Sequence, residues 1–348
     1  MDYQDNNNVS GRPEGANQGL PPQILTVMQK NKKSGWGVFW GILLGLSVLA
    51  NFIFFIVIIG LFAVVVTGHT GVMTEKVLIE GPRSDKIAVI RVEGIIDSYT
   101  AQDVIEQIQY AKSDVHVRAI ILSVNSPGGT ISASDQIHNE IIKFRNEEYK
   151  PVVAFMQSLA ASGGYYISVT ADEIVAEPTT ITGSIGVIMG YLVLEDMLQG
   201  KLGIEPIIIK SGQKKDWPSS FHYPSEEELM YFQEKVIDPA FERFKNIVTD
   251  GRIKLTVEDV NRLADGSIFS AEEALSENLI DEIGYFDDAV NKARQLAGLD
   301  DAQVVEYVRP FSLSGLLGSE AEGSIFKLDK NTIYELSTPQ VMYLWSIH

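Results

Sequence analysis

The stretch PVVAFMQSLAASGGYYISV, residues 151–169, decides how this chain folds. It begins with a short apolar run, Val152 to Met156, which is typical of a strand buried on both faces. The small residues at 160–164 then predict a tight turn that opens a helix over 161–169. Such a turn exposes the hydroxyl of Ser162, and free N–H groups at the helix start can hold a developing oxyanion. The stretch therefore predicts an acyl-transfer nucleophile at Ser162, although a Ser between Ala and Gly also occurs in ordinary strand–helix turns.

Alternating strands and helices extend on both sides of this stretch. Further strands are expected at residues 87–92, 119–124, 173–176, 184–188 and 206–210. Further helices are expected at residues 101–112, 131–144, 193–201, 225–249, 257–264, 271–277 and 287–297. Strands joined by helical crossovers predict an α/β fold built of repeated strand–helix units.

An uncharged segment near the N-terminus predicts a membrane anchor. No Asp, Glu, Lys or Arg occurs between Ser34 and Thr74, and residues 36–66 are nearly all apolar. At about 1.5 Å per residue this run exceeds the roughly 30 Å of a hydrocarbon core. Lysines at 30, 32 and 33 precede it, so the positive-inside bias predicts a cytoplasmic N-terminus and an extracytoplasmic domain. The sequence thus predicts one transmembrane helix in the cell membrane.

The segments of the chain differ in composition, and the differences predict its organisation. We expect a disordered cytoplasmic tail at 1–33, an anchor at 34–68, a connector at 69–85, a catalytic domain at 86–300 and a C-terminal extension of unknown role at 301–348.

Composition excludes several classes of protein. The net charge of −18 argues against a nucleic-acid partner, and the absence of cysteine excludes disulfides and thiol nucleophiles. None of the five histidines lies in a triad-like or HExxH pattern, so neither a Ser-His-Asp triad nor a metallopeptidase is supported. We expect no metal and no cofactor.

Two loops supply the chemistry that Ser162 would need. The Asn125–Gly129 loop follows an expected strand, and its Pro-Gly-Gly sequence can turn a backbone N–H toward a substrate carbonyl. The Ser211–Asp216 loop carries Lys215, and a lysine can replace histidine as the base when burial lowers its pKa. On spacing alone, an ordinary Pro-Gly turn and a solvated loop lysine remain open alternatives.

Together these segments resemble the signal peptide peptidase A family, membrane-bound serine peptidases with a Ser-Lys dyad on a Clp protease/crotonase-like fold. The resemblance covers about residues 86–298 and is carried by NSPGG (125–129), ASGGYY (161–166), TGSIGV (182–187) and SGxxKD (211–216). It implies that Ser162 is the nucleophile and that Lys215 is the general base. Lys214 is set aside because it is the fourth residue of SGxxKD and the family lysine is the fifth.

The resemblance also assigns supporting roles. It implies that Ser184 orients the lysine and that Gly129 and Gly163 donate to the oxyanion, with Gly128 an open alternative to Gly129. A single copy of the core implies the half-length form, a ring-like homo-oligomer in which Ser162 and Lys215 can meet across a subunit boundary.

The resulting hypothesis is a membrane-anchored serine endopeptidase that hydrolyses remnant signal peptides and similar short or unfolded segments at the extracytoplasmic membrane face. Peptides would bind extended along a strand edge, with shallow pockets for small or apolar side chains. One alternative is a catalytically inactive scaffold of the same fold. Others are a crotonase-type acyl-CoA enzyme, for which no acidic residue stands at position 162, and self-cleavage in the Leu313–Gly323 segment.

Overall fold

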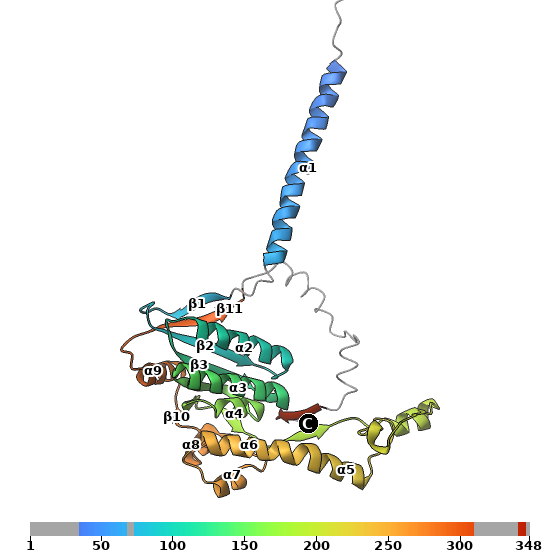
Figure 1. Ribbon diagram of the computed structural model, residues 1–348, viewed down its shortest axis with the longest axis vertical. Coiled ribbons are helices and arrows are strands. Elements are labelled where there is room, and N and C mark those ends of the chain that lie inside the picture. Colours follow the sequence, from blue (N-terminus) through green and yellow to red (C-terminus); the bar gives the residue numbers. More distant parts are fainter. Residues whose placement is uncertain (1–34, 68–72, 310–339, 346–348) are drawn as a thin grey trace, which may run out of the picture. The chain divides into compact units, whose positions relative to one another are not determined.

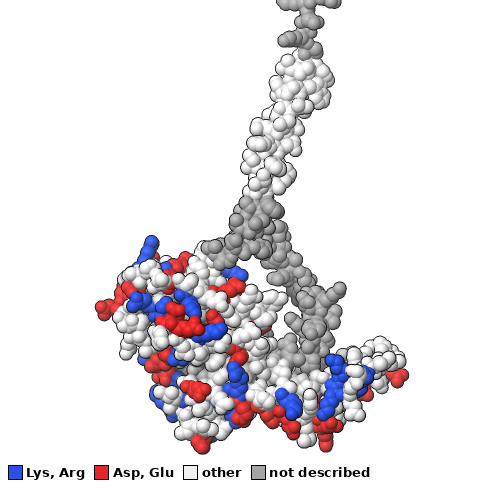
Figure 2. Space-filling model, viewed as in Figure 1, with Lys and Arg blue, Asp and Glu red and all other residues white. Residues whose placement is uncertain are grey.

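The apolar N-terminal segment forms a single long helix. The computed structural model describes residues 35–67, 73–309 and 340–345, and it places α1 at Gly35–Thr67. Over residues 35–60 this helix is apolar enough to cross a membrane, and its side chains are exposed. Figure 2 shows no charged side chain on it. A helix with apolar side chains all round and no protein packed against them fits a single-pass membrane anchor. Most of α1 belongs to a unit separate from the globular one.

A mixed sheet organises the globular unit (Figure 1). Its strands run in the order β1-β11-β2-β3-β5-β6-β10, parallel from β11 to β10, with β1 antiparallel at one edge. The bounds are β1 Thr74–Ile79, β2 Lys86–Glu93, β3 Val117–Ser126, β5 Val152–Ala161, β6 Glu173–Ala176, β10 Glu282–Ile283 and β11 Gln303–Val308. This is the α/β architecture that the sequence predicts.

Helices cover both faces of this sheet. Along β2, Ile87 and Val89 face α9 (Phe286–Ala297), whereas Ala88 and Ile90 face the cluster that holds α2 (Ser98–Ser113) and α3 (Ile131–Glu148). Successive strand residues point to opposite faces, so an apolar residue at every position fits burial on both sides. That double burial is why the central strands read as continuous apolar runs.

The remaining elements lie around the site end of the sheet. They are β4 Gly128–Thr130, α4 Gly163–Ser168, β7 Ile181–Gly183, β8 Ile188–Gly190, η1 Asp196–Lys201, η2 Gln213–Asp216, α5 Glu226–Phe232, η3 Gln233–Ile237, α6 Asp238–Gly251, α7 Val257–Leu263, β9 Ile268–Ser270, α8 Ala271–Ser276 and β12 Gln340–Leu344. β4, β12 and β8 form a second, three-stranded sheet, and β7 and β9 branch from β5.

The sheet extends past the expected domain boundaries at both ends. β1 lies in the segment predicted as a connector (69–85), and β11 lies in the predicted extension (301–348). The two strands pair with each other, and β11 also pairs with β2. The central sheet therefore needs residues outside 86–300. The predicted tail (1–33) and the Leu313–Gly323 segment lie outside the described residues.

Local predictions fail mainly in the segment between β7 and α5. The expected strand 184–188 is replaced by β7 and β8 on either side of it, and the expected helix 193–201 is reduced to the single turn η1. The expected strand 206–210 is not formed; Ile207 and Ile209 are 85% and 96% exposed there. The expected helix 225–249 is realised as α5, η3 and α6, with a π turn in its middle.

Candidate active site

Ser162 lies between β5 and α4 in a backbone conformation that few side chains adopt. Its φ of 54° and ψ of −115° are unusual for a residue other than glycine. Its N–H donates to Gly183 O at 2.8 Å, and its carbonyl accepts from Tyr166 N at 2.8 Å. Such strain persists only where the surroundings fix it, and it is common at catalytic turns. The predicted nucleophile thus sits at a rigid, strained junction.

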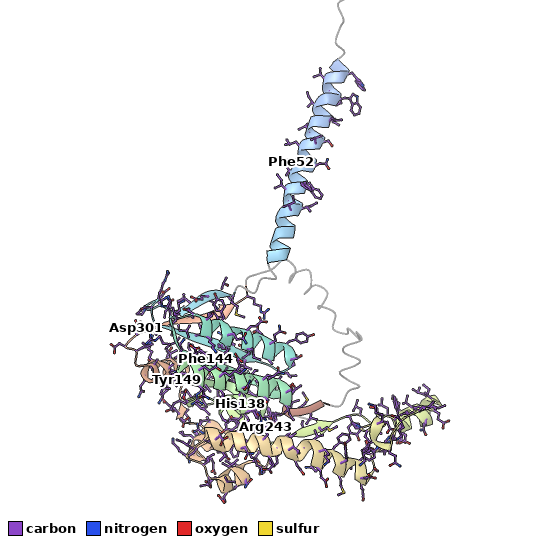
Figure 3. The ribbon with its side chains drawn as sticks, in the orientation of Figure 1. Phe52, His138, Phe144, Tyr149, Arg243 and Asp301 are labelled. Atoms are coloured by element: carbon purple, nitrogen blue, oxygen red, sulfur yellow. The ribbon has the colours of Figure 1, made fainter. Side chains whose placement is uncertain are left out.

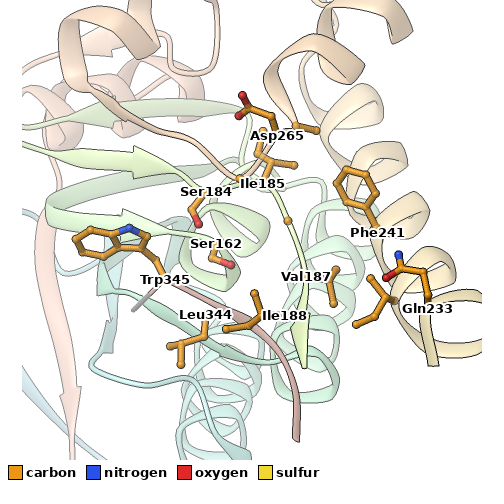
Figure 4. Close-up of a pocket in the computed structure, with 14 residues that line it drawn as sticks. Ser162, Ser184, Ile185, Val187, Ile188, Gln233, Phe241, Asp265, Leu344 and Trp345 are labelled. Atoms are coloured by element: carbon orange, nitrogen blue, oxygen red, sulfur yellow. The ribbon is translucent and has the colours of Figure 1, made fainter. Parts of the chain in front are cut away.

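Ser162 and Ser184 line one cavity of about 550 Å³ (Figure 4). Figure 4 shows the two serine side chains close together, with Leu344 and Trp345 beside them. Ser184 also has a positive φ, 52°, and its N–H donates to Ser267 O at 2.7 Å. The structure therefore brings together the predicted nucleophile and the predicted orienting serine, which are 22 positions apart.

The backbone amides of Gly129 and Gly163 lie close to each other. On one side of β4, Gly128 O and Thr130 N bond to Ile96, so the Gly129 N–H faces the opposite side. The Gly128 N–H donates to Ser126 Oγ at 3.0 Å. A Cβ atom added at Gly163 would lie 3.1 Å from Gly129 N. The start of α4 therefore lies close to β4 at these two glycines. Gly163 is the first residue of α4, so its N–H has no acceptor within that helix.

The C-terminal strand β12 lies along this group of amides. It pairs antiparallel with β4, Tyr343 opposite Gly129 and Leu344 opposite Gly128, and on its other side with β8. Trp345 N donates to Pro127 O at 2.9 Å, so Trp345 and Pro127 form a hydrogen-bonded pair. Because such pairs alternate with non-hydrogen-bonded pairs along an antiparallel ladder, Tyr343 and Gly129 are the next hydrogen-bonded pair. A Cβ atom added at Gly128 would overlap the Tyr343 carbonyl oxygen and lie 2.6 Å from Gly163 N. The Tyr343 carbonyl oxygen thus lies near Gly163 N, and Tyr343 lies opposite Gly129 in the strand ladder.

The structure does not bring Lys215 to Ser162. Lys215 is exposed in η2, does not line the cavity and has no ion-pair partner among the described residues. Its neighbour Lys214 is engaged: Nζ lies 3.1 Å from a carboxylate oxygen of Glu227, and it lies over the rings of Trp217 and Tyr231 at 4.7 and 4.5 Å. Of the two lysines, Lys215 is the one whose amine is not held within the described part of the chain.

The charge of the cavity is negative. Asp265 is on its rim, and the Ser267 side chain and N–H hold the pKa of that carboxyl below its usual value. No Lys, Arg or His is among the residues that line it. Two hydroxyls, two amides and a carboxylate can bind and polarise a peptide, but they include no base for Ser162 at neutral pH.

Sequence reasoning missed several residues at this site. Ser126 is fully buried, accepts from Gly128 N and donates to Gly94 O at 2.6 Å, so it fixes the loop that carries Gly129. Tyr343 and Trp345 were assigned to an extension without a role. The run of β-branched and aromatic residues at 341–345 was a strand signal, but nothing local named its partner.

Comparisons with known proteins show the family to which the chain belongs. A model described as peptidase family S49 matches residues 144–300, and a model of the NfeD1b N-terminal domain matches residues 86–191. A protein of Enterococcus faecium assigned as signal peptide peptidase SppA is 39% identical over 68% of this chain and 70% of its own length. The longer Protease 4 of Haemophilus influenzae is 38% identical over 61% of this chain and 35% of its length.

A chloroplast serine protease of Arabidopsis thaliana, SPPA, is 31% identical over 70% of this chain and 37% of its length. The S49 match includes the Ser162 turn, Ser184 and the loop that carries Lys215. The α/β fold is consistent with the Clp/crotonase-like fold. The chain belongs to peptidase family S49, the signal peptide peptidase A family.

Proposed function

We propose that this chain is a membrane-anchored serine endopeptidase in which Ser162 is the nucleophile and Lys215 is the general base. The observation that carries the proposal is the cavity itself. It is lined by the strained Ser162 and by Ser184, and the neighbouring amides of Gly129 and Gly163 lie close to each other. A bound extended strand already lies against those amides, as a substrate peptide would.

The reaction follows from these positions. The neutral amine of Lys215 takes the proton of the Ser162 hydroxyl as Oγ bonds to the peptide carbonyl carbon. The Gly129 and Gly163 N–H groups bind the resulting oxyanion; Gly129 is preferred to Gly128, whose N–H is used by Ser126. The lysine proton then passes to the leaving amine as the C–N bond breaks. Water hydrolyses the acyl ester and restores Ser162, and Ser184 orients the lysine amine.

The base would come from a neighbouring copy of the chain. Lys215 lies next to a segment with many exposed apolar side chains, including Leu202, Ile207 and Ile209. Exposed apolar surface of this kind is typical of interaction sites. A ring-like homo-oligomer would cover this segment and bring the Lys215 amine to the anionic cavity of the next subunit.

Mixing two inactive variants tests the shared site. Ser162→Ala and Lys215→Ala chains should each lack peptide hydrolysis. Co-assembled in equal amounts, they should regain about a quarter of wild-type activity, because random mixing pairs an intact serine with an intact neighbouring lysine in that fraction of sites. A mixture that stays inactive although the two chains demonstrably co-assemble would place the dyad within one subunit. Wild-type rates of peptide hydrolysis by the Ser162→Ala chain alone would refute Ser162 as the nucleophile.

The anchor and the strand-shaped site suggest the substrates. Family resemblance and one N-terminal apolar helix support remnant signal peptides or other short segments at the extracytoplasmic membrane face, with the N-terminus in the cytoplasm. Such segments are unfolded, so they can pair with β4 and β8 in the way that β12 does.

The position of β12 favours a second activity, cleavage of the chain's own C-terminus. Tyr343 lies opposite Gly129 and its carbonyl oxygen lies near Gly163 N, so the bond in register with the proposed oxyanion donors is Tyr343–Leu344. Hydrolysis there would release residues 344–348. Intact mass after incubation should show this loss in wild type and full mass in Ser162→Ala. An unchanged wild-type mass would refute self-cleavage and leave β12 only the role of competing with substrate for the site.

A further inference from the structure

The turn that carries Lys215 is closed by its own backbone. Lys215 N donates to Gly212 O at 3.1 Å, and Trp217 N donates to Lys214 O at 3.4 Å, on either side of η2. Figure 3 shows the side chains of this segment on the yellow-green ribbon, across the view from α9. The turn therefore does not depend on the side chains around it for its hydrogen bonds.

Asp216, the next residue along the chain, is engaged by another lysine. The Lys210 amine donates to both carboxylate oxygens of Asp216, at 2.7 and 2.8 Å, and to Gln213 O at 3.1 Å. The Asp216 side chain is only 12% exposed. The Lys210 amine holds the pKa of this carboxyl below its usual value, so Asp216 carries a negative charge at neutral pH. A charged carboxylate thus follows the proposed base in the chain, with Lys210 as its partner.

The other ionisable groups around Asp216 do not replace Lys210. His222 Nε2 lies 3.8 Å from a carboxylate oxygen of Asp216, which is too far for a hydrogen bond. Glu228 of α5 is 1% exposed, and burial raises the pKa of its carboxyl, so it offers Asp216 no positive charge. Lys214 is held elsewhere, by an exposed carboxylate of α5. Among the described residues, Lys210 is the cation that hydrogen-bonds to Asp216.

The pairing of Asp216 decides whether the Lys215 amine stays unpaired. A carboxylate without a partner attracts a nearby ammonium and stabilises its protonated form, which cannot take a proton from a serine. Lys210 already donates to both oxygens of Asp216. The Lys215 amine has no ion-pair partner among the described residues, so it is available to a hydroxyl of another chain.

We propose that Lys210 is a positioning residue for the reaction: it occupies Asp216 and thereby keeps the Lys215 amine free to act on Ser162 of a neighbouring copy. The inference rests on the proposed function, because it concerns the base that this function needs. It gives a role to Asp216, the last residue of the SGxxKD segment, and to a lysine outside that segment.

Removing Lys210 should impair the reaction unless the charge of Asp216 is removed as well. All chains carry Tyr343→Ala, so that β12 does not compete with an added quenched-fluorescent peptide. Lys210→Met should lower kcat/KM at least about fivefold, the size expected for a new lysine–carboxylate pair at a partly exposed site. The double variant Lys210→Met, Asp216→Asn should return to within about twofold of the parent, because no charged carboxylate then follows Lys215.

The matched control is Lys214→Met, which removes an amine from the same turn. Its partner, Glu227, has a side chain that is 73% exposed and therefore well solvated, so kcat/KM should stay within about twofold. A double variant no more active than Lys210→Met would mean that Lys210 only holds the turn, and this result would overturn the inference. An undiminished kcat/KM in Lys210→Met would overturn it too.

Acylation of Lys215 gives a readout that needs no catalysis. Chains with Ser162→Ala and Tyr343→Ala are treated briefly with acetic anhydride, and peptide mass spectrometry compares Lys215 with Lys214, which serves as the internal reference. Only a neutral amine reacts, so Lys210→Met should slow acylation of Lys215 relative to Lys214 at least about fivefold, and the added Asp216→Asn should restore it.

The two readouts separate this inference from the proposed function. An acylation ratio that Lys210→Met leaves unchanged would overturn the inference even if the enzyme is active. The expected change in the ratio, found in a chain whose peptide hydrolysis does not need Lys215, would instead refute the proposed function. The pairing of Lys210 with Asp216 would then still keep the Lys215 amine unpaired.

Discussion

Replacing Tyr343 by Ala should release the C-terminal strand from the active site. The change removes a fully buried ring and its hydrogen bond to Ala240 O from β12. Among the described residues, β12 is held by its pairing with β4 and β8 and by the packing of the Tyr343 ring against Tyr166 and Phe244. Because β12 is short, one side chain supplies a large share of its docking free energy.

The magnitude can be worked out from burial. An aromatic side chain buries roughly 150–250 Å², which at about 25 cal/mol/Å² corresponds to about 4–6 kcal/mol as an upper limit. Large-aromatic-to-alanine changes in protein cores cost about 3–5 kcal/mol. Taking the lower end, about 3 kcal/mol reduces the docked-to-undocked ratio of β12 about 100-fold.

The assay is hydrolysis of an added quenched-fluorescent peptide by the full chain. Only molecules with β12 undocked can bind this peptide, so its apparent KM should fall by up to about 100-fold in Tyr343→Ala while kcat stays within about twofold. The matched control is Met342→Ala, because neighbouring strand residues point to opposite faces and Met342 is only partly buried. An unchanged KM in Tyr343→Ala, or an equal fall in Met342→Ala, would refute the idea that β12 competes with substrate.

Three further predictions concern stability and the site. Burial alone would raise the pKa of Asp281, but the Arg252 guanidinium lowers that pKa below its usual 3.8. The Arg252–Asp281 pair therefore stabilises the fold above pH 3.8, and this stabilisation is lost as the pH falls through the folded-state pKa. Asp281→Asn should cost about 3–5 kcal/mol of unfolding free energy at pH 7 in urea titrations, shrinking below pH 4; a pH-independent cost would contradict this. Gly129→Ala places a Cβ atom 2.0 Å from the carbonyl oxygen of Ile96, so β4 must shift by about an ångström or more. The variant should lower fluorophosphonate labelling about tenfold or more, and normal labelling would exclude Gly129 as a donor. Ser184→Ala should lower kcat about tenfold or more with KM unchanged, and a change in KM alone would argue against an orienting role.

The central strands and the serine turn could be predicted because their signals are local. Residues 87–90 and 119–122 are buried on both faces, so each reads as the apolar run that is typical of a doubly buried strand. Small residues at 160–164 likewise mark the turn, since Gly163 and Gly164 meet Ser134 and Ser126 at distances that exclude a side chain.

Predictions failed where structure depends on distant partners. β12 pairs with β4, more than 200 positions earlier in the chain, and no local pattern identifies such a partner. The Ile-rich run at 206–210 has strand composition, but it finds no partner strand within the described part of the chain and stays exposed. For the same reason the family resemblance could propose Lys215 as the base without showing where its amine acts.

The most direct test of the Ser-Lys dyad is fluorophosphonate labelling of Ser162 across pH 6 to 10. It compares three full-length chains that all carry Tyr343→Ala: the parent, Lys215→Ala and Lys214→Ala. We predict that Ser162 is labelled in the parent and in Lys214→Ala at each pH tested, and that Lys215→Ala abolishes this labelling. Equal labelling of all three chains, or no labelling of the parent, would contradict Lys215 as the base that activates Ser162.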